Sequence, residues 1–89
     1  MAHSLSAKKR IRQSITRRSR NRGRKARIHD LEKAFDQAVL NADADQAQLH
    51  FRKLSGYLDK ISLTSTMHKN TAARKKSTAA RRLAKLQTS

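Results

Sequence analysis

Residues 28–45, IHDLEKAFDQAVLNADAD, combine a clear apolar periodicity with a polar turn. The apolar residues of this stretch recur at intervals of three and four, the spacing of one helix face. They are Ile28, Leu31, Phe35, Ala38, Val39 and Ala42. The residues that follow, Asn41 to Asp45, are typical of a short connection, and either Asp43 or Asp45 can cap the next helix. The stretch therefore predicts the end of one helix, a turn and the start of a second.

Upstream of this stretch nothing forces a break in the helix. The chain has no proline and only two glycines, so sharp turns are scarce. Ser6 has the character of an N-cap, and Gly23 is the weakest point, disfavouring the helix by up to about 1 kcal/mol. The first helix is thus predicted to begin near Ala7 and to reach about 36 residues, or about 54 Å.

Downstream, a second helix is predicted over 44–62. Its buried stripe is Ala47, Phe51, Leu54, Leu58 and Ile61, with Tyr57 at the edge. Residues 63–66 form the second connection, in which Ser65 or Thr66 is the cap. A third helix then spans 67–86. Its inner face is predicted to consist mainly of small residues: Asn70, Ala73, Ser77, Ala80 and Ala84, with Leu83 and Leu86 adding bulk.

Short connections make neighbouring helices antiparallel, so the predicted fold is an all-α, up-down-up three-helix bundle. The second and third helices are each about 30 Å long, well short of the first. The first helix should therefore protrude. We expect a single domain over 1–89, with the bundle in 28–89 and a basic extension of the first helix in 1–27.

Positive charge is concentrated at both ends of this 89-residue chain, whose net charge is +16. Residues 1–28 contain eleven basic residues and no acidic one, and residues 64–89 contain seven and none. Residues 29–63 contain four basic and all six acidic residues. The two ends are either solvated tails or surfaces for a polyanion. The second interpretation is favoured because a polyanion would relieve the self-repulsion of so much charge.

The residue types around this charge favour phosphate and shape recognition. Phe35, Phe51 and Tyr57 all lie in the near-neutral middle, so the basic segments lack platforms on which single-stranded bases stack. Arginine predominates in the first segment and offers a bidentate fork to phosphate. The basic residues surround the helix, which suits a helix embedded among RNA segments better than one lying on a membrane.

Several other classes of function find no support. There is no cysteine, and His3, His29, His50 and His68 lack the spacing of a metal site. Asp30, Glu32 and Asp36 are expected to form ion pairs with Lys33 and with basic side chains of neighbouring helices, and not to act in catalysis. We expect no enzyme activity, cofactor, metal or small-molecule substrate. No apolar run approaches a membrane span, and no secretory signal is expected at the N-terminus.

Two segments resemble the signatures of a known family. SAKKRIRQS (residues 6–14) and HKNTAARKKS (residues 68–77) are similar to motifs of the family of bacterial small-subunit ribosomal protein number twenty. The resemblance implies a three-helix bundle with a protruding first helix in the cytoplasmic ribosome. It also implies direct binding to small-subunit (16S-type) ribosomal RNA early in assembly, with other ribosomal proteins as neighbours. A nucleoid-type protein that compacts DNA is the alternative, since the same charge would serve it.

The matched positions supply candidate RNA contacts in both basic segments. In the first helix they are Lys8, Lys9, Arg10, Ser14, Asn21 and Arg24, and in the third His68, Lys69, Asn70, Arg74, Lys75 and Lys76. The arginine content of the first segment adds Arg12, Arg17 and Arg18. In the third helix, the three lysines are expected to project outward, while Asn70, Ala73 and Ser77 face the bundle.

Overall fold

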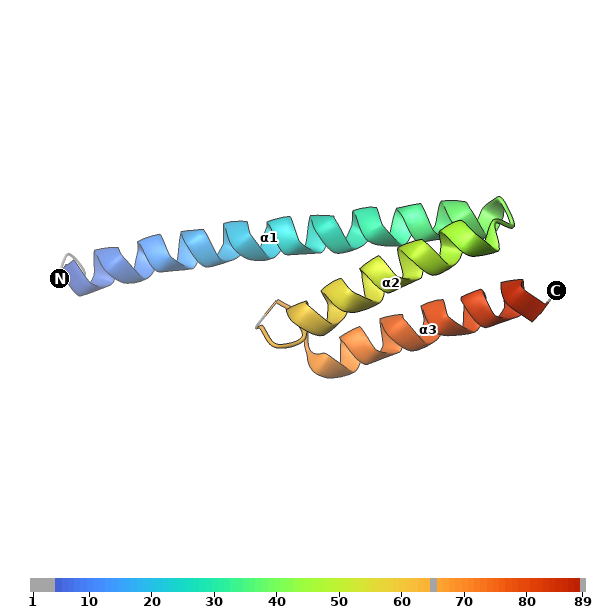
Figure 1. Cartoon of the computed structure of the whole chain (residues 1–89). Coiled ribbons are helices and arrows are strands. Elements are labelled where there is room, and N and C mark those ends of the chain that lie inside the picture. Colours follow the sequence, from blue (N-terminus) through green and yellow to red (C-terminus); the bar gives the residue numbers. More distant parts are fainter. Residues whose placement is uncertain (1–4, 65, 89) are drawn as a thin grey trace.

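The computed structural model describes residues 5–64 and 66–88. These residues form three helices and no strand: α1 (Leu5–Leu40), α2 (Ala44–Ile61) and α3 (Lys69–Thr88). Helix α2 returns antiparallel along the second half of α1, and α3 reverses again beside α2 (Figure 1). The up-down-up bundle with a long first helix is confirmed. Its principal extents, 65 × 21 × 14 Å, reflect the length of α1.

Helix α1 runs unbroken through Gly23 but differs at both ends from the prediction. It begins at Leu5, so Ser6 lies inside the helix and is not its N-cap. It ends at Leu40, so Ala42 does not belong to its apolar face. The reason is a Schellman-type termination, in which Ala42 takes a left-handed φ of 54° and Asp43 N–H donates to Ala38 C=O over 3.1 Å.

The start of α2 is set by Asp43, one of the two predicted caps. Its Oδ1 accepts a hydrogen bond from the backbone N–H of Gln46 over 3.1 Å. Asp45 lies in the first turn of α2, where its negative charge interacts favourably with the helix dipole. The turn therefore satisfies backbone groups at the end of α1 and at the start of α2.

We expect Asp43→Ala to lower the free energy of unfolding by about 1 kcal/mol, because the backbone N–H of Gln46 loses its acceptor. Urea denaturation of the two proteins measures the difference. Asp43→Asn is the matched control and should retain most of the stability, since its side-chain oxygen can still accept the bond. Equal losses in both variants would show that the charge, rather than the cap, is what stabilises the turn.

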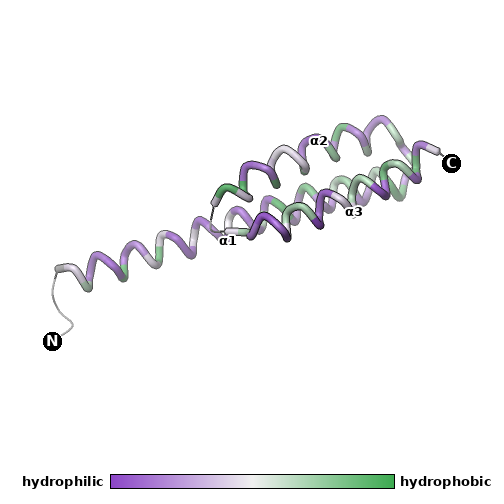
Figure 2. Tube along the Cα trace, turned by 90° about the horizontal axis from the view of Figure 1, so that it is seen from below, coloured by the Kyte–Doolittle hydropathy of each residue, from purple (hydrophilic) through white to green (hydrophobic). Residues whose placement is uncertain are grey.

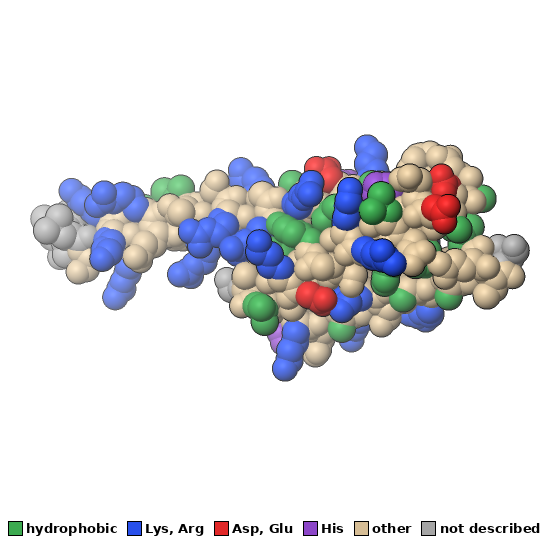
Figure 3. Space-filling model, viewed as in Figure 1, with side chains coloured by type: hydrophobic (Ala, Val, Ile, Leu, Met, Phe, Trp, Pro, Cys, Tyr) green, Lys and Arg blue, Asp and Glu red, His purple; other side chains and the backbone are tan. Residues whose placement is uncertain are grey.

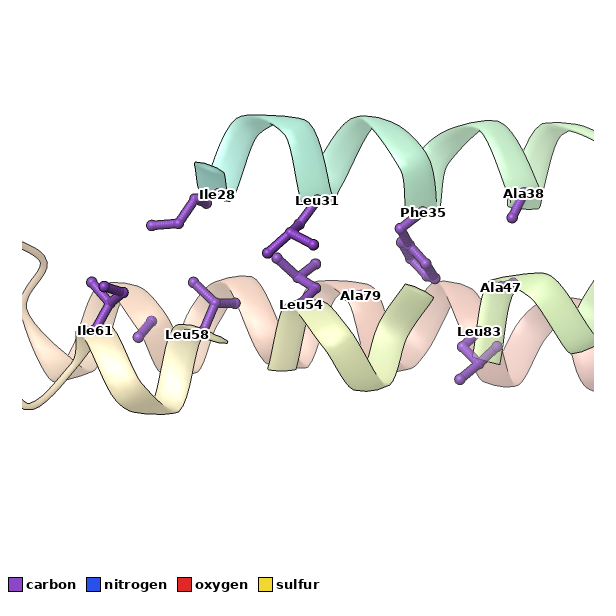
Figure 4. Packing of buried hydrophobic residues seen from close by; sticks show 11 residues of the cluster. Ile28, Leu31, Phe35, Ala38, Ala47, Leu54, Leu58, Ile61, Ala79 and Leu83 are labelled. Atoms are coloured by element: carbon purple, nitrogen blue, oxygen red, sulfur yellow. The ribbon is translucent and has the colours of Figure 1, made fainter. Parts of the chain in front are cut away.

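The core lies between the three helices and starts only at Ile28 (Figure 4). Its buried residues come from all three helices: Ile28, Leu31, Phe35, Ala38, Ala47, Leu54, Leu58, Ile61, Ala72, Ala79 and Leu83. Tyr57 is partly buried at the edge of this cluster, as predicted, whereas Phe51, predicted to be buried, is only partly buried against it. The rings of Phe35 and Phe51 lie 6.3 Å apart at 52°, a tilted arrangement that favours aromatic pairs.

The inner face of α3 was predicted wrongly. Ala72, Ala79 and Leu83 are buried and Leu86 is partly buried, whereas the predicted small residues are exposed: Asn70, Ala73, Ser77, Ala80 and Ala84. The leucines decide the orientation because burying one of them removes far more apolar surface from water than burying an alanine. The face that contains Leu83 and Leu86 therefore turns inward.

Helix α3 also begins later than predicted. Its first residue is Lys69, and Met67 lies in the connection before it. His68 occupies the cap position, since its Nδ1 accepts from the N–H of Asn70 over 3.1 Å. Thr66 was one of the two predicted caps, but its side chain turns toward α1 instead. The other, Ser65, lies outside the described residues.

Candidate nucleic-acid interface

The first half of α1 projects beyond the bundle and has no helix beside it (Figures 1 and 2). Every residue from 8 to 20 is exposed. Seven of these thirteen are basic and none is acidic: Lys8, Lys9, Arg10, Arg12, Arg17, Arg18 and Arg20. We call this segment, residues 8–20, the cationic rod. Figure 3 shows its basic side chains spread along the projecting part of the molecule.

The contacts within the cationic rod are local and join successive turns. Thr16 Oγ1 donates to the carbonyl of Arg12 over 3.0 Å, so its hydroxyl proton is engaged within the helix. Arg18 Nη2 lies 3.5 Å from Ser14 Oγ. Ile11 and Ile15, one turn apart, are 60% and 57% exposed and form only a narrow apolar stripe. A guanidinium carries five N–H donors, so Arg18 keeps most of its donors for an outside partner.

Asn21 and Arg24 lie where the rod joins the bundle, and both are half-buried. Arg24 Nη1 donates to Thr66 Oγ1 over 3.0 Å, and Thr66 Oγ1 donates to Asn21 Oδ1 over 2.6 Å. The structure thus brings these two predicted contact residues together through a third. This role of Thr66 could not be predicted from the sequence, because Arg24 and Asn21 lie 42 and 45 positions away from it along the chain, beyond the reach of any local pattern.

Two of the predicted contacts in α3 are engaged within the protein. Lys75 Nζ lies 2.7 Å from Glu32 Oε1 of α1, and Lys76 Nζ lies 2.6 Å from Asp59 Oδ1 of α2. The expectation that both lysines project freely outward is therefore wrong. The acidic side chains of the other two helices lie opposite them and draw them in. His68, Lys69, Asn70 and Arg74 are exposed, as a contact surface requires.

Arg82 adds a further link between α3 and α1. Its guanidinium pairs with Asp36 and lies over the ring of Phe35, 5.5 Å from the centroid. The predicted pairing of acidic residues of α1 with basic side chains of neighbouring helices is confirmed for Glu32 and Asp36. The ion pairs among the described residues do not include Asp30 or Lys33. The pairs of Glu32 and Asp36 are about one-third to one-half exposed, so each stabilises the bundle only slightly. These pairs compensate only part of the positive charge of the bundle, whereas the cationic rod contains no acidic residue at all.

The described residues contain neither a cluster of metal ligands nor a membrane-spanning helix. In residues 5–64 and 66–88, no three His, Cys, Asp or Glu side chains lie together as metal ligands would. None of the helices described there is both long and apolar enough to cross a bilayer. The strongest feature that remains is the cationic rod, and a helical bundle with such a rod has the build of a polyanion-binding protein.

Comparison with known proteins narrows this class to one family. Residues 2–84 match the family model described as ribosomal protein S20. The small ribosomal subunit protein bS20 of Nitrosomonas eutropha is 39% identical over 77 residues, which cover 86% of this chain and 88% of that protein. The proteins of the same name from Akkermansia muciniphila and Helicobacter hepaticus are 38% and 44% identical over 86 and 75 residues. Those alignments cover 97% and 84% of this chain, and 99% and 83% of the two relatives.

The chain belongs to the ribosomal protein S20 family. The family consists of structural constituents of the small ribosomal subunit and is not an enzyme family. The family resemblance found in residues 6–14 and 68–77 is therefore confirmed.

Proposed function

We propose that this chain is a structural constituent of the small subunit of the cytoplasmic ribosome, where it binds the 16S-type ribosomal RNA directly and aids assembly. It acts without catalysis, and other ribosomal proteins are its neighbours. The observation that carries the proposal is the cationic rod: thirteen consecutive exposed residues, seven of them basic, with no helix beside them. Family membership agrees with this, since the relatives are proteins of the small ribosomal subunit.

The mechanism we propose is electrostatic. Each Lys or Arg that neutralises a phosphate releases condensed counterions, which favours binding at low salt. RNA segments that repel one another can then approach closely on several sides of the rod, a helix about 10–12 Å across with its side chains. The exposed arginines can also grip phosphates with two parallel hydrogen bonds. The contacts in this account recognise the RNA backbone and its shape.

The positions of the aromatic residues support backbone recognition over base stacking. Phe35 is buried, and Phe51 and Tyr57 are partly buried against the core. Their rings are therefore engaged in the bundle and lie on its helices rather than on the rod. A single-stranded nucleic acid would find no row of aromatic platforms along the exposed cations.

The proposal divides the chain into two working parts. Residues 28–89 contain the apolar core formed by the described part of the chain, and they hold the molecule together. Residues 1–27 form the RNA-embedded extension, with the exposed part of α3 near His68, Lys69, Asn70 and Arg74 as a second contact surface. Lys75 and Lys76 join that surface only where RNA phosphates displace the carboxylates that hold them.

Sedimentation of native particles tests the proposed function. The chain should remain with the small subunit after a high-salt wash, because it is held among RNA segments and not merely adsorbed. In a parallel binding assay, small-subunit RNA should outcompete duplex DNA at equal nucleotide concentration. Release in the wash together with displacement of the RNA by duplex DNA would favour the DNA-compacting alternative.

Glu32→Gln should strengthen RNA binding by about threefold, because the neutral amide no longer attracts the charge of Lys75, which becomes more available for a phosphate. Asp45→Asn is the matched control, since it removes one negative charge from an exposed site near the start of α2. Titrations of both variants at one fixed salt concentration make the comparison. An equal gain in the two variants would mean that net charge alone acts, and that Lys75 gains no RNA contact.

A further inference from the structure

Thr66 stands out as the buried polar side chain of the described residues, with 9% of its surface exposed. It lies in the connection between α2 and α3, yet its hydroxyl contacts α1 at Asn21 and Arg24. Both contacts fall just beyond the cationic rod, one to two turns before the first core residue, Ile28. A hydroxyl buried at this junction fixes the two side chains that a ligand of the rod would meet next.

The direction of each hydrogen bond follows from the chemistry of the groups. A guanidinium can only donate, so Thr66 Oγ1 accepts from Arg24 Nη1. The single hydroxyl proton is then directed to Asn21 Oδ1, at 2.6 Å. This leaves both N–H groups of the Asn21 amide and four of the five N–H groups of Arg24 as donors. Asn21 and Arg24 are three residues apart, so they share one face of α1.

The connection that carries Thr66 is itself anchored. Thr64 Oγ1 donates to the carbonyl of Ile61, the last residue of α2, over 2.7 Å. The backbone N–H of Thr66 donates to the same Thr64 oxygen over 3.2 Å. A short chain of hydrogen bonds therefore runs from the end of α2 to the side chains of α1. Thr66 therefore contacts Asn21 and Arg24 from a connection that is itself held to the end of α2.

We propose that Thr66 is a positioning residue that presets Asn21 and Arg24 as one binding site for a backbone phosphate of RNA. The inference rests on the proposed function and adds a residue that itself touches no RNA. Arginine loses side-chain entropy when it is immobilised on a ligand. Because Thr66 already restrains Arg24 and orients the amide of Asn21, part of that cost is met before the phosphate arrives.

Thr66→Val tests the inference, because it keeps the shape of the side chain and removes the hydroxyl. In titrations with small-subunit RNA, the affinity should fall up to about tenfold, which is the order of the cost of immobilising one long side chain on the ligand. The same substitution in an Asn21→Ala/Arg24→Ala background should change the affinity by less than twofold. That non-additivity is the readout, since damage to the fold would weaken binding equally in both backgrounds.

Thr66→Ser and Thr66→Ala form a second pair that does not depend on how valine packs. They differ by the hydroxyl alone, so the serine variant should bind within about twofold of the original chain and the alanine variant about tenfold more weakly. Equal affinities of the two, or a loss in Thr66→Val that persists in the double-alanine background, would overturn the inference. Failure of the unaltered chain to bind the RNA would instead overturn the proposed function.

Discussion

A chain that starts at residue 21 should bind small-subunit ribosomal RNA at least about a thousandfold more weakly than the full chain. The truncation removes seven cations that face solvent on all sides of α1. A loss of this order matches the salt sensitivity of proteins that make about six to ten phosphate contacts. Equilibrium titration at low salt, where binding of the truncated chain is still measurable, gives the ratio.

The bundle of the truncated chain should stay folded. Its core begins at Ile28, and the link from Thr66 to Asn21 and Arg24 is retained. Thermal unfolding followed by circular dichroism should therefore show a cooperative transition. A truncated chain without such a transition would show that the rod supports the bundle, contrary to the proposed division of the chain.

A second variant separates charge from length. Replacing four arginines of the rod with glutamine keeps the helix, because glutamine has a high helix propensity. The four are Arg12, Arg17, Arg18 and Arg20. This variant should lose most of the affinity that the truncation loses. Full retention of binding would mean that the rod acts through its shape alone.

The other large effect is expected on stability. Phe35→Ala should lower the free energy of unfolding by about 3–5 kcal/mol, the usual cost of removing a buried aromatic ring. Phe35 is 1% exposed and contacts both Phe51 and the guanidinium of Arg82. The free energy of unfolding of a small domain is only about 5–15 kcal/mol, so much of the variant should be unfolded at moderate temperature. Urea denaturation measures the difference.

Leu40→Ala is the control for Phe35→Ala. Leu40 ends the same helix but is 77% exposed, so its truncation should change the free energy of unfolding by less than about 0.5 kcal/mol. Comparable losses in the two variants would contradict the placement of the core. They would mean that apolar residues at the end of α1 are covered to a similar degree.

The first two helices could be predicted from the sequence because their apolar residues are large and regularly spaced. Ile28, Leu31 and Phe35 define one face of α1, and Leu54 and Leu58 define one face of α2. The protruding rod then followed from the unequal helix lengths. The pairing of Glu32 and Asp36 with basic side chains of α3 was also predictable, since these acidic residues lie in the middle of a basic chain.

The third helix was harder because small residues occur on several of its faces. Alanine contributes little apolar area, so spacing alone does not separate the face of Ala73 and Ala80 from that of Ala72 and Ala79. Starting from Leu83 and Leu86 would have given the correct face. The ion pairs of Lys75 and Lys76 depend on how far α3 slides along its neighbours, which no local pattern specifies.

The dependence of RNA affinity on salt shows whether the cationic rod contacts phosphates. We expect the slope of log affinity against log salt concentration to be smaller in magnitude by about three to four for the glutamine variant than for the unaltered chain. That variant replaces Arg12, Arg17, Arg18 and Arg20. Such a change in slope would show that these four side chains neutralise phosphates in the complex. Identical slopes would show that they do not, and the cationic rod would then not be the RNA-binding surface.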